Sequence, residues 1–182
     1  MSRIPLPAPA DAPAASRPLL QQIDAAFGGS APVMFRAVAH SPAALRSLWG
    51  SFGALSAGGV PPALAEQIAV AVANRNACHY CLAAHTALGR KAGVSAEDLA
   101  EAQAGRSRDP RTAAALAFAL KVVDRRAQVD ADDIAALKRA GFDDGTIVEL
   151  LAHVALNLFT NYVNIALDVP VDFPAVPLRE AA

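Results

Sequence analysis

The sequence predicts an all-α fold, and three observations lead to this prediction. Alanine supplies much of the 54% hydrophobic content, and alanine is the strongest helix former. Apolar residues recur at helical spacing in several segments, and proline, glycine, serine or aspartate stand where helices should begin or end. No segment is convincing as a strand. With 182 residues the chain is long enough for one domain with a sizeable core.

The chain begins with an extended proline-rich arm, which we assign to residues 1–16. Residues 1–18, which include this arm, contain five prolines and no apolar stretch typical of a signal peptide. Such a segment cannot fold alone, so we expect it to pack on a neighbouring subunit. Residues 17–182 are predicted to form a single helical domain.

Four helices are predicted in the first half of that domain. The second of them should begin at the cap Ser41, which is followed by a proline in the first turn. The third begins with a proline pair and is apolar on most sides, which indicates a buried helix. The segments are residues 17–29, 41–59, 61–77 and 78–92.

Four more helices and a tail are predicted in the second half. Each helix follows a serine or an aspartate that can cap it. The last helix is long and apolar, and the tail after it is broken by prolines. The helices cover residues 95–105, 109–128, 130–142 and 143–168, and the tail covers residues 169–182.

Charge and hydropathy exclude two classes of partner. The net charge is −1 and no basic stripe runs along the chain, so we expect no nucleic-acid binding. We also expect no membrane span, because the longest apolar segment, residues 146–167, carries polar groups that are costly in lipid. Buried amides among them would need partners. We therefore predict a cytoplasmic protein. The polar residues are Glu149, His153, Asn157, Asn161 and Asn164.

Both cysteines of the chain lie in one short segment, "ANRNACHYCLAAHTALGRKAG". On a helix, Cys78 and Cys81 would share a face, and His85 would lie one turn beyond Cys81. A histidine beside a cysteine can accept its proton and leave a nucleophilic thiolate. Glu66, twelve residues before Cys78, could orient the His85 ring if the two helices pack antiparallel. Helix-end electrostatics favour Cys78 as the acidic thiol, whereas His85 favours Cys81.

Two other interpretations of the cysteine pair stay open beside redox chemistry. Haem attachment is excluded, because Leu82 and not histidine follows Cys81. The cysteines could be inert and buried. A zinc site would use both cysteines and His85, and would need a fourth ligand such as His79, Glu66 or His153.

The segment "EQIAVAVANRNACHYCLAAH" resembles the core motif of the alkylhydroperoxidase D-like branch of the carboxymuconolactone decarboxylase family. Glu66, Cys78, Cys81 and His85 all match that motif at its spacing. A weaker similarity to peroxidase-related members covers most of residues 30–177. The resemblance implies an alkylhydroperoxidase D-like helical bundle and a homo-oligomer, either a dimer, a trimer or a hexamer.

The same resemblance implies an oxidoreductase, a thiol-dependent peroxidase acting on organic hydroperoxides. Cys81 would attack the peroxide and become a sulfenic acid, and Cys78 would resolve it as a disulfide. His85 would take the proton of Cys81, and Glu66 would hold His85. An external dithiol or a thioredoxin-like reductant would restore the thiols. We expect neither a cofactor nor a resident metal.

The sequence departs from the family motif at one position. The best-known members have a histidine immediately before the second cysteine, and here that residue is Tyr80. Tyr80, His79 and His153 are candidate auxiliary residues. Three alternative functions stay open, namely a lactone decarboxylase of the same superfamily, a zinc-binding protein and a non-catalytic redox sensor.

Overall fold

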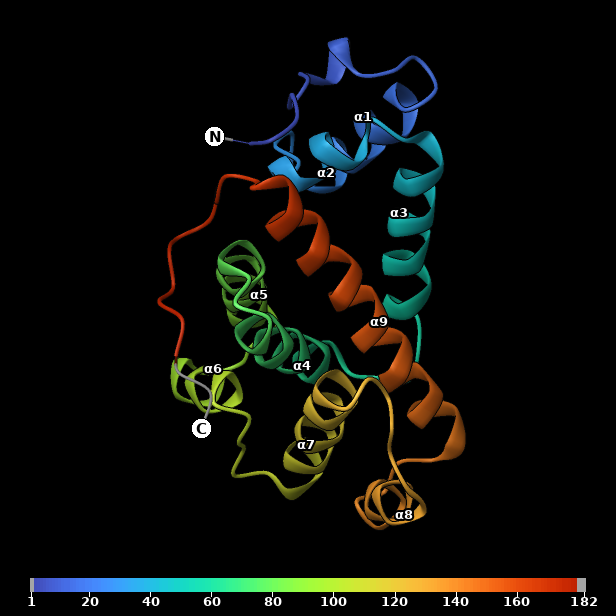
Figure 1. The fold of residues 1–182 in the computed structure, drawn as a ribbon, viewed down its shortest axis with the longest axis vertical. Helices are drawn as coiled ribbons and strands as arrows, with labels where there is room; N and C mark the ends of the chain where they lie inside the picture. The colour runs from blue at the N-terminus through green and yellow to red at the C-terminus, as the bar shows by residue number, and fades with distance from the viewer. Residues whose placement is uncertain (1, 180–182) are drawn as a thin grey trace.

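The computed structural model describes residues 2–179, and within this range every regular element is a helix (Figure 1). The all-α prediction is confirmed. A 3-10 turn, η1 (Pro9–Asp11), comes before the α-helices. The α-helices are α1 (Arg17–Ala26), α2 (Val33–Val38), α3 (Pro42–Ser56), α4 (Pro62–Arg75), α5 (His79–Lys91), α6 (Ala96–Gln103), α7 (Pro110–Asp124), α8 (Ala131–Arg139) and α9 (Asp144–Leu167).

Side-chain caps explain why several of the helices, α3 and α9 among them, begin where the sequence predicts. The Ser41 hydroxyl accepts a hydrogen bond from the Ala44 N–H at 3.2 Å, at the start of α3. The Asp143 carboxylate accepts one from the Thr146 N–H at 2.7 Å, at the start of α9. Each cap satisfies an N–H that has no partner inside the helix.

Helix α2 is absent from the sequence-based prediction. It has six residues, begins after Pro32 and has no side-chain cap. So short an element shows no helical period, and the tertiary structure stabilises it instead. It buries Met34, Phe35, Ala37 and Val38.

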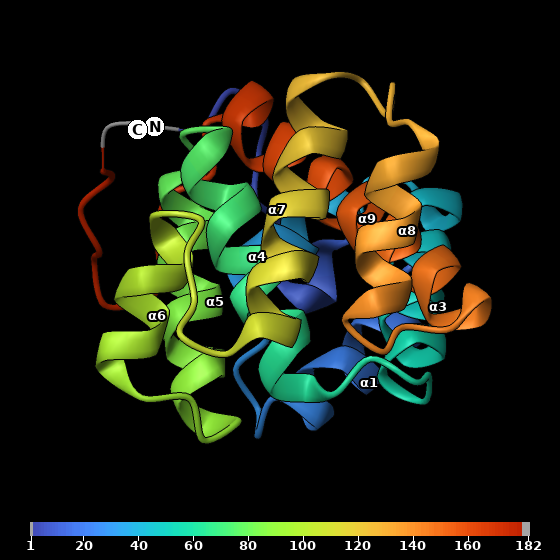
Figure 2. The same ribbon diagram turned by 90° about the horizontal axis from the view of Figure 1, so that it is seen from below.

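Helices α4 and α9 form the centre of the molecule. Helix α9 lies between α3 on one side and α4 and α5 on the other (Figure 1), and it also contacts α2, α7 and α8. Helix α4 packs against α5, α6, α7 and α9, and Figure 2 shows it behind α7. Nearly every side of α4 is therefore buried. Ile68 and Val72 of α4 and Leu150 and Val154 of α9 are at most 1% exposed.

Among the described helices, only α9 is long and apolar enough to cross a membrane by length and composition. An 18-residue window of it has a mean hydropathy of 1.4. However, α9 packs against six other helices, and its buried face carries one histidine and several polar side chains. These features are typical of the core helix of a helical bundle.

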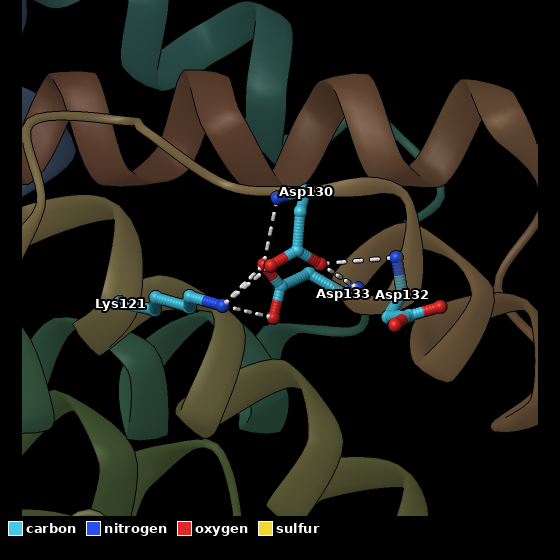
Figure 3. A network of polar contacts seen from close by, with 4 residues as sticks. All are labelled: Lys121, Asp130, Asp132 and Asp133. Atoms are coloured by element: carbon cyan, nitrogen blue, oxygen red, sulfur yellow. Dashed lines mark hydrogen bonds and ion pairs between the residues drawn. The ribbon is translucent and has the colours of Figure 1, made fainter.

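The long connection between α7 and α8 is tied by a polar network (Figure 3). Lys121 of α7 contacts the carboxylates of Asp130 and Asp133 at 3.4 and 2.6 Å. Asp130 and Asp133 also form a capping box at the start of α8. The same two carboxylates therefore start α8 and hold it beside α7.

The N-terminal arm packs on its own chain, where we expected a neighbouring subunit. The backbone N–H of Arg3 donates to the Leu167 carbonyl at the end of α9, at 2.8 Å. The Arg36 guanidinium on α2 donates to the carbonyl of Pro7 at 2.8 Å. Extended, proline-rich backbone leaves its carbonyls free, so nearby cationic side chains can bind them.

The close approach of α4, α5 and α6 depends on Gly89. A Cβ atom there would lie 2.7 Å from Leu99 Cδ2 and 3.4 Å from Glu66 Cβ. We predict that Gly89→Val lowers the free energy of unfolding by about 1–3 kcal/mol, because the added methyl groups force α5 away from its neighbours. Urea denaturation measures this quantity.

The matched control is Gly50→Val. Gly50 is a helical glycine of α3 and has nothing within 4 Å of the added Cβ. Equal losses of stability in the two variants would show that backbone entropy and β-branching, not crowding, explain the Gly89 effect.

Candidate active site

The first turn of α5 brings the two cysteines together. Ala77 adopts a left-handed backbone conformation with φ of 54°, which reverses the chain between α4 and α5. Cys78 is the N-cap of α5, and its sulfur accepts a hydrogen bond from the Cys81 N–H at 3.3 Å. Both thiols are free, and they are 1% and 2% exposed. The pair therefore lies in the core at a helix N-terminus.

Glu66 and His85 meet across the α4–α5 interface, as the sequence predicts for antiparallel helices. His85 Nδ1 lies 2.8 Å from Glu66 Oε2. The two side chains are 12% and 21% exposed. Because Nδ1 bonds the carboxylate, Nε2 is the ring nitrogen that Glu66 leaves free.

The thiols have opposite pKa shifts. A hydrogen bond from the Cys78 side chain, the His85 charge and amides of α9 lower the pKa of Cys81 to about 6, although its burial opposes them. The hydrogen bond to Cys81, burial and the charge of the Cys81 thiolate raise the pKa of Cys78. Burial lowers the pKa of His85, but the Glu66 carboxylate outweighs it, so that pKa is raised. Cys81 is thus the acidic thiol.

Asn164 on α9 contacts the reactive sulfur directly. Its Nδ2 donates to Cys81 Sγ at 3.2 Å, and the side chain is buried. From the sequence we predicted that a buried Asn164 amide would need a hydrogen-bond partner. We did not predict that it would lie beside the cysteines. Its Oδ1 is buried and has no hydrogen-bond partner among the described residues.

Cys81 opens into a cavity of about 360 Å³. The end of α1, α2, α3 and the tail provide most of the aromatic side chains, whereas α4, α5 and α9 provide all the polar groups except Ser56, the last residue of α3. Such a volume is at the lower end of the roughly 300–1,000 Å³ found for ligand pockets. The polar lining consists of Cys81, His85, Glu66, Tyr80, Asn164, Thr160 and Ser56.

The structure separates the three auxiliary candidates. Tyr80 lines the cavity, and its hydroxyl accepts a hydrogen bond from the Met34 N–H at 3.2 Å. His79 is exposed and lines neither cavity. His153 lines a second cavity of about 140 Å³, which also reaches Glu66 and His85 but does not reach Cys81.

The zinc interpretation finds no ligand cluster in residues 2–179. No three histidine, cysteine, aspartate or glutamate side chains converge there in a way that could hold a metal ion. One nitrogen of His85 is already bonded to Glu66.

Comparison with a family model identifies the motif. Residues 37–125, which include Glu66, both cysteines and His85, match the model of the carboxymuconolactone decarboxylase family. Over these residues the chain is similar to that family. No curated protein gives a significant match to this chain.

Solved structures extend the similarity over nearly the whole chain. A peroxidase-related protein of Ralstonia eutropha with an alkylhydroperoxidase AhpD core is 28% identical, with a TM-score of 0.84, and covers 94% of this chain and 92% of its own. A peroxidase-related protein of Silicibacter sp. is 24% identical, with a TM-score of 0.81, and covers 93% and 91%. The debrominase Bmp8, in a variant crystallised with 2,3,4-tribromopyrrole, is 21% identical, with a TM-score of 0.77, and covers 94% of each chain. The chain has the AhpD-like helical fold.

We predict that His85→Ala raises the pH midpoint of Cys81 alkylation by about 1–2 pH units. In the unmodified protein the rate should rise through about pH 6 as the thiolate forms, and then level off. Removing His85 removes a positive charge that favours the thiolate, so the thiolate forms only at higher pH. Iodoacetamide labelling followed by peptide mass spectrometry measures the alkylation rate of Cys81 separately from that of Cys78. His79→Ala, at an exposed neighbouring histidine, is the control and should leave the midpoint unchanged.

We predict a similar upward shift for Asn164→Leu. A hydrogen bond to a charged group contributes about 1.5–3 kcal/mol, and this converts to roughly 1–2 pKa units. Asn157→Leu is the matched control, because the Asn157 amide donates to the His153 carbonyl and does not contact sulfur. The alkylation profile of each variant measures the effect. Coincident profiles for the two variants would mean that Asn164 does not stabilise the thiolate.

Proposed function

We propose that the protein is a thiol-dependent peroxidase that reduces organic hydroperoxides. The observation that carries this proposal is the pair of contacting thiols with opposite pKa shifts at a ligand-sized cavity. One thiol is a thiolate near neutral pH, and the other stays protonated. A nucleophile and a resolving thiol need these two states.

Cys81 is the proposed nucleophile. Its thiolate attacks the terminal peroxide oxygen, the S–O bond forms and the O–O bond breaks. The electron pair leaves on the alkoxide oxygen, which takes a proton from the His85 imidazolium. Cys78 then attacks the sulfenic acid, water leaves and a disulfide forms. An external dithiol or a thioredoxin-like reductant returns both thiols.

Glu66 and His85 act as a pair in this proposal. The Glu66 carboxylate fixes the ring and keeps Nδ1 protonated, so that Nε2 exchanges the proton. Tyr80 is proposed to support the cavity wall rather than to transfer protons, because burial raises its pKa. His153 is proposed to stabilise the fold behind the Glu66–His85 pair.

The lactone alternative has less support. Chemistry on a carboxylated lactone calls for a cation that binds the carboxylate, and no lysine or arginine is among the described residues that line the cavity. Decarboxylation of a lactone would also not require two adjacent thiols.

A second candidate function is reductive removal of halogen from an aromatic ring, and the aromatic lining of the cavity favours it. Bmp8, a debrominase, has the same fold. The thiolate would take the halogen, the ring carbon would take a proton, and Cys78 would displace the halide to form the disulfide. Bromide release from 2,3,4-tribromopyrrole, compared with hydroperoxide consumption at the same dithiol concentration, separates the two candidates.

We also propose a cytoplasmic homo-oligomer. An apolar stripe that follows the outer face of α9 at helical spacing supports the oligomer. Stripes of this kind are typical of subunit interfaces. The exposed side chains are Val148 at 64%, Leu151 at 36%, Phe159 at 38%, Tyr162 at 59% and Ile165 at 43%.

The peroxidase proposal predicts different defects for the two cysteine variants. Cys81→Ser should lower dithiol-dependent hydroperoxide consumption about a thousandfold or more, because the nucleophile is lost. Cys78→Ser should still react once and then accumulate a sulfenic acid at Cys81, because no resolving thiol remains. Peroxide assays and dimedone trapping with mass spectrometry measure the two outcomes. Activity in Cys81→Ser equal to that of the unmodified protein would refute the proposal.

A further inference from the structure

The lining of the cavity divides into two contiguous groups of side chains. One group is the polar site, in which Asn164 contacts Cys81 and Glu66 contacts His85. The other is an aromatic cluster centred on Phe35, which we call the aromatic wall. It consists of Phe27 from the end of α1, Phe35 from α2, and Trp49 and Phe52 from α3.

Direct ring contacts make the aromatic wall a continuous surface. The Phe35 centroid lies 5.8 Å from those of Phe27 and Trp49 and 6.2 Å from that of Phe52. The Phe35–Trp49 pair meets edge to face, with planes at 83°. On the tail, Phe173 meets Tyr80 edge to face at 5.8 Å and lines the same cavity. Rings so arranged present both faces and edges to a further ring.

The charge of the lining restricts the ligand further. Among the described lining residues, Glu66 is the one carboxylate, and His85 neutralises it. No lysine or arginine stands among the lining residues within 2–179 to bind an anion. A ligand that fits is therefore uncharged, largely apolar and small enough for about 360 Å³.

Asn164 supplies an anchor for the polar end of such a ligand. Its Oδ1 is a buried acceptor without a partner among the described residues, while its Nδ2 holds the Cys81 sulfur. A buried acceptor is costly unless a donor reaches it. A hydroperoxide carries one O–H, on the oxygen that the thiolate attacks. With that O–H donated to Oδ1, the reacting oxygen lies beside the sulfur.

We propose that the substrate is an arylalkyl hydroperoxide with a single ring, in which a saturated carbon links the ring to the O–O group. This inference rests on the peroxidase function proposed above and deepens it. The ring packs on the aromatic wall, and the O–H binds Asn164 Oδ1. The Cys81 thiolate attacks the hydroxyl-bearing oxygen, and the O–O bond breaks. The aryl-bearing alkoxide leaves with the electron pair and takes the His85 proton, so the peroxide gains the two electrons that sulfur loses.

The experiment compares two probes that differ by one ring. Cumene hydroperoxide and tert-butyl hydroperoxide are consumed in the presence of excess dithiothreitol, and kcat/KM is measured for each. We expect cumene hydroperoxide to be preferred by at least about tenfold, because stacking and burial of the ring stabilise its transition state. Phe27→Leu should reduce that preference several-fold, because it removes one ring of the aromatic wall.

Phe159→Leu is a closely matched control. Phe159 is 38% exposed and lies outside the cavity, whereas Phe27 is 37% exposed and lines it. The preference for the aryl probe should survive in Phe159→Leu. Equal kcat/KM for the two hydroperoxides in the unmodified protein, or equal losses of preference in the two variants, would overturn the aryl assignment and leave the peroxidase function standing.

Binding can be read without turnover because Trp49 is the chain's single tryptophan and belongs to the aromatic wall. Cumyl alcohol, the product of the aryl probe, should change the Trp49 fluorescence at concentrations at least tenfold lower than tert-butyl alcohol does. Identical titrations would also overturn the aryl assignment. If neither hydroperoxide is consumed, the proposed function fails, and the titration still decides whether the cavity prefers a ring.

Discussion

The packing of α5 against α4 is the constraint on which the site depends. The left-handed turn at Ala77 starts this packing, and at the other end Gly89 leaves room for Leu99 of α6 beside Glu66 of α4. Between these points Glu66 and His85 are held at 2.8 Å. A shift of one helix along the other would break this hydrogen bond. It would also move Cys81, which lies one turn before His85 on the same helix.

The two thiols differ in pKa because they share one small environment. The N-terminus of α5 favours the thiolate form of either cysteine. However, two adjacent negative charges in the core would repel each other, so only one thiol ionises. His85 and the amide of Asn164 both act on Cys81, so the charge settles there and the Cys78 thiol donates to it. The pair thereby divides into an acidic and a protonated sulfur, and pairs of groups with diverging pKa values are typical of acid–base sites.

The helices and the Glu66–His85 contact could be predicted from the sequence, but the residues that form the walls of the cavity could not. Capping residues and apolar periodicity predicted every α-helix of more than six residues, because these signals are local. Glu66 could be paired with His85 because antiparallel packing of adjacent helices follows from a short connection. The Asn164–Cys81 contact spans 83 positions, and the aromatic wall joins three helices. No local pattern encodes such contacts. The direction of the cysteine pKa shifts likewise required the actual positions of His85 and the amides.

The C-terminal half of helix α9 has its polarity reversed relative to an ordinary surface helix, with polar side chains buried and apolar side chains exposed. Its inner face carries amides that find partners, as when Asn161 Oδ1 accepts from Asn76 Nδ2 at 2.8 Å. Its outer face carries Tyr162 and Ile165, which are exposed in the single chain. Asn164 and Ile165 are adjacent, so the residue that stabilises the thiolate sits on the same rigid turn as the apolar stripe. Any subunit that covers this stripe would hold that turn in place.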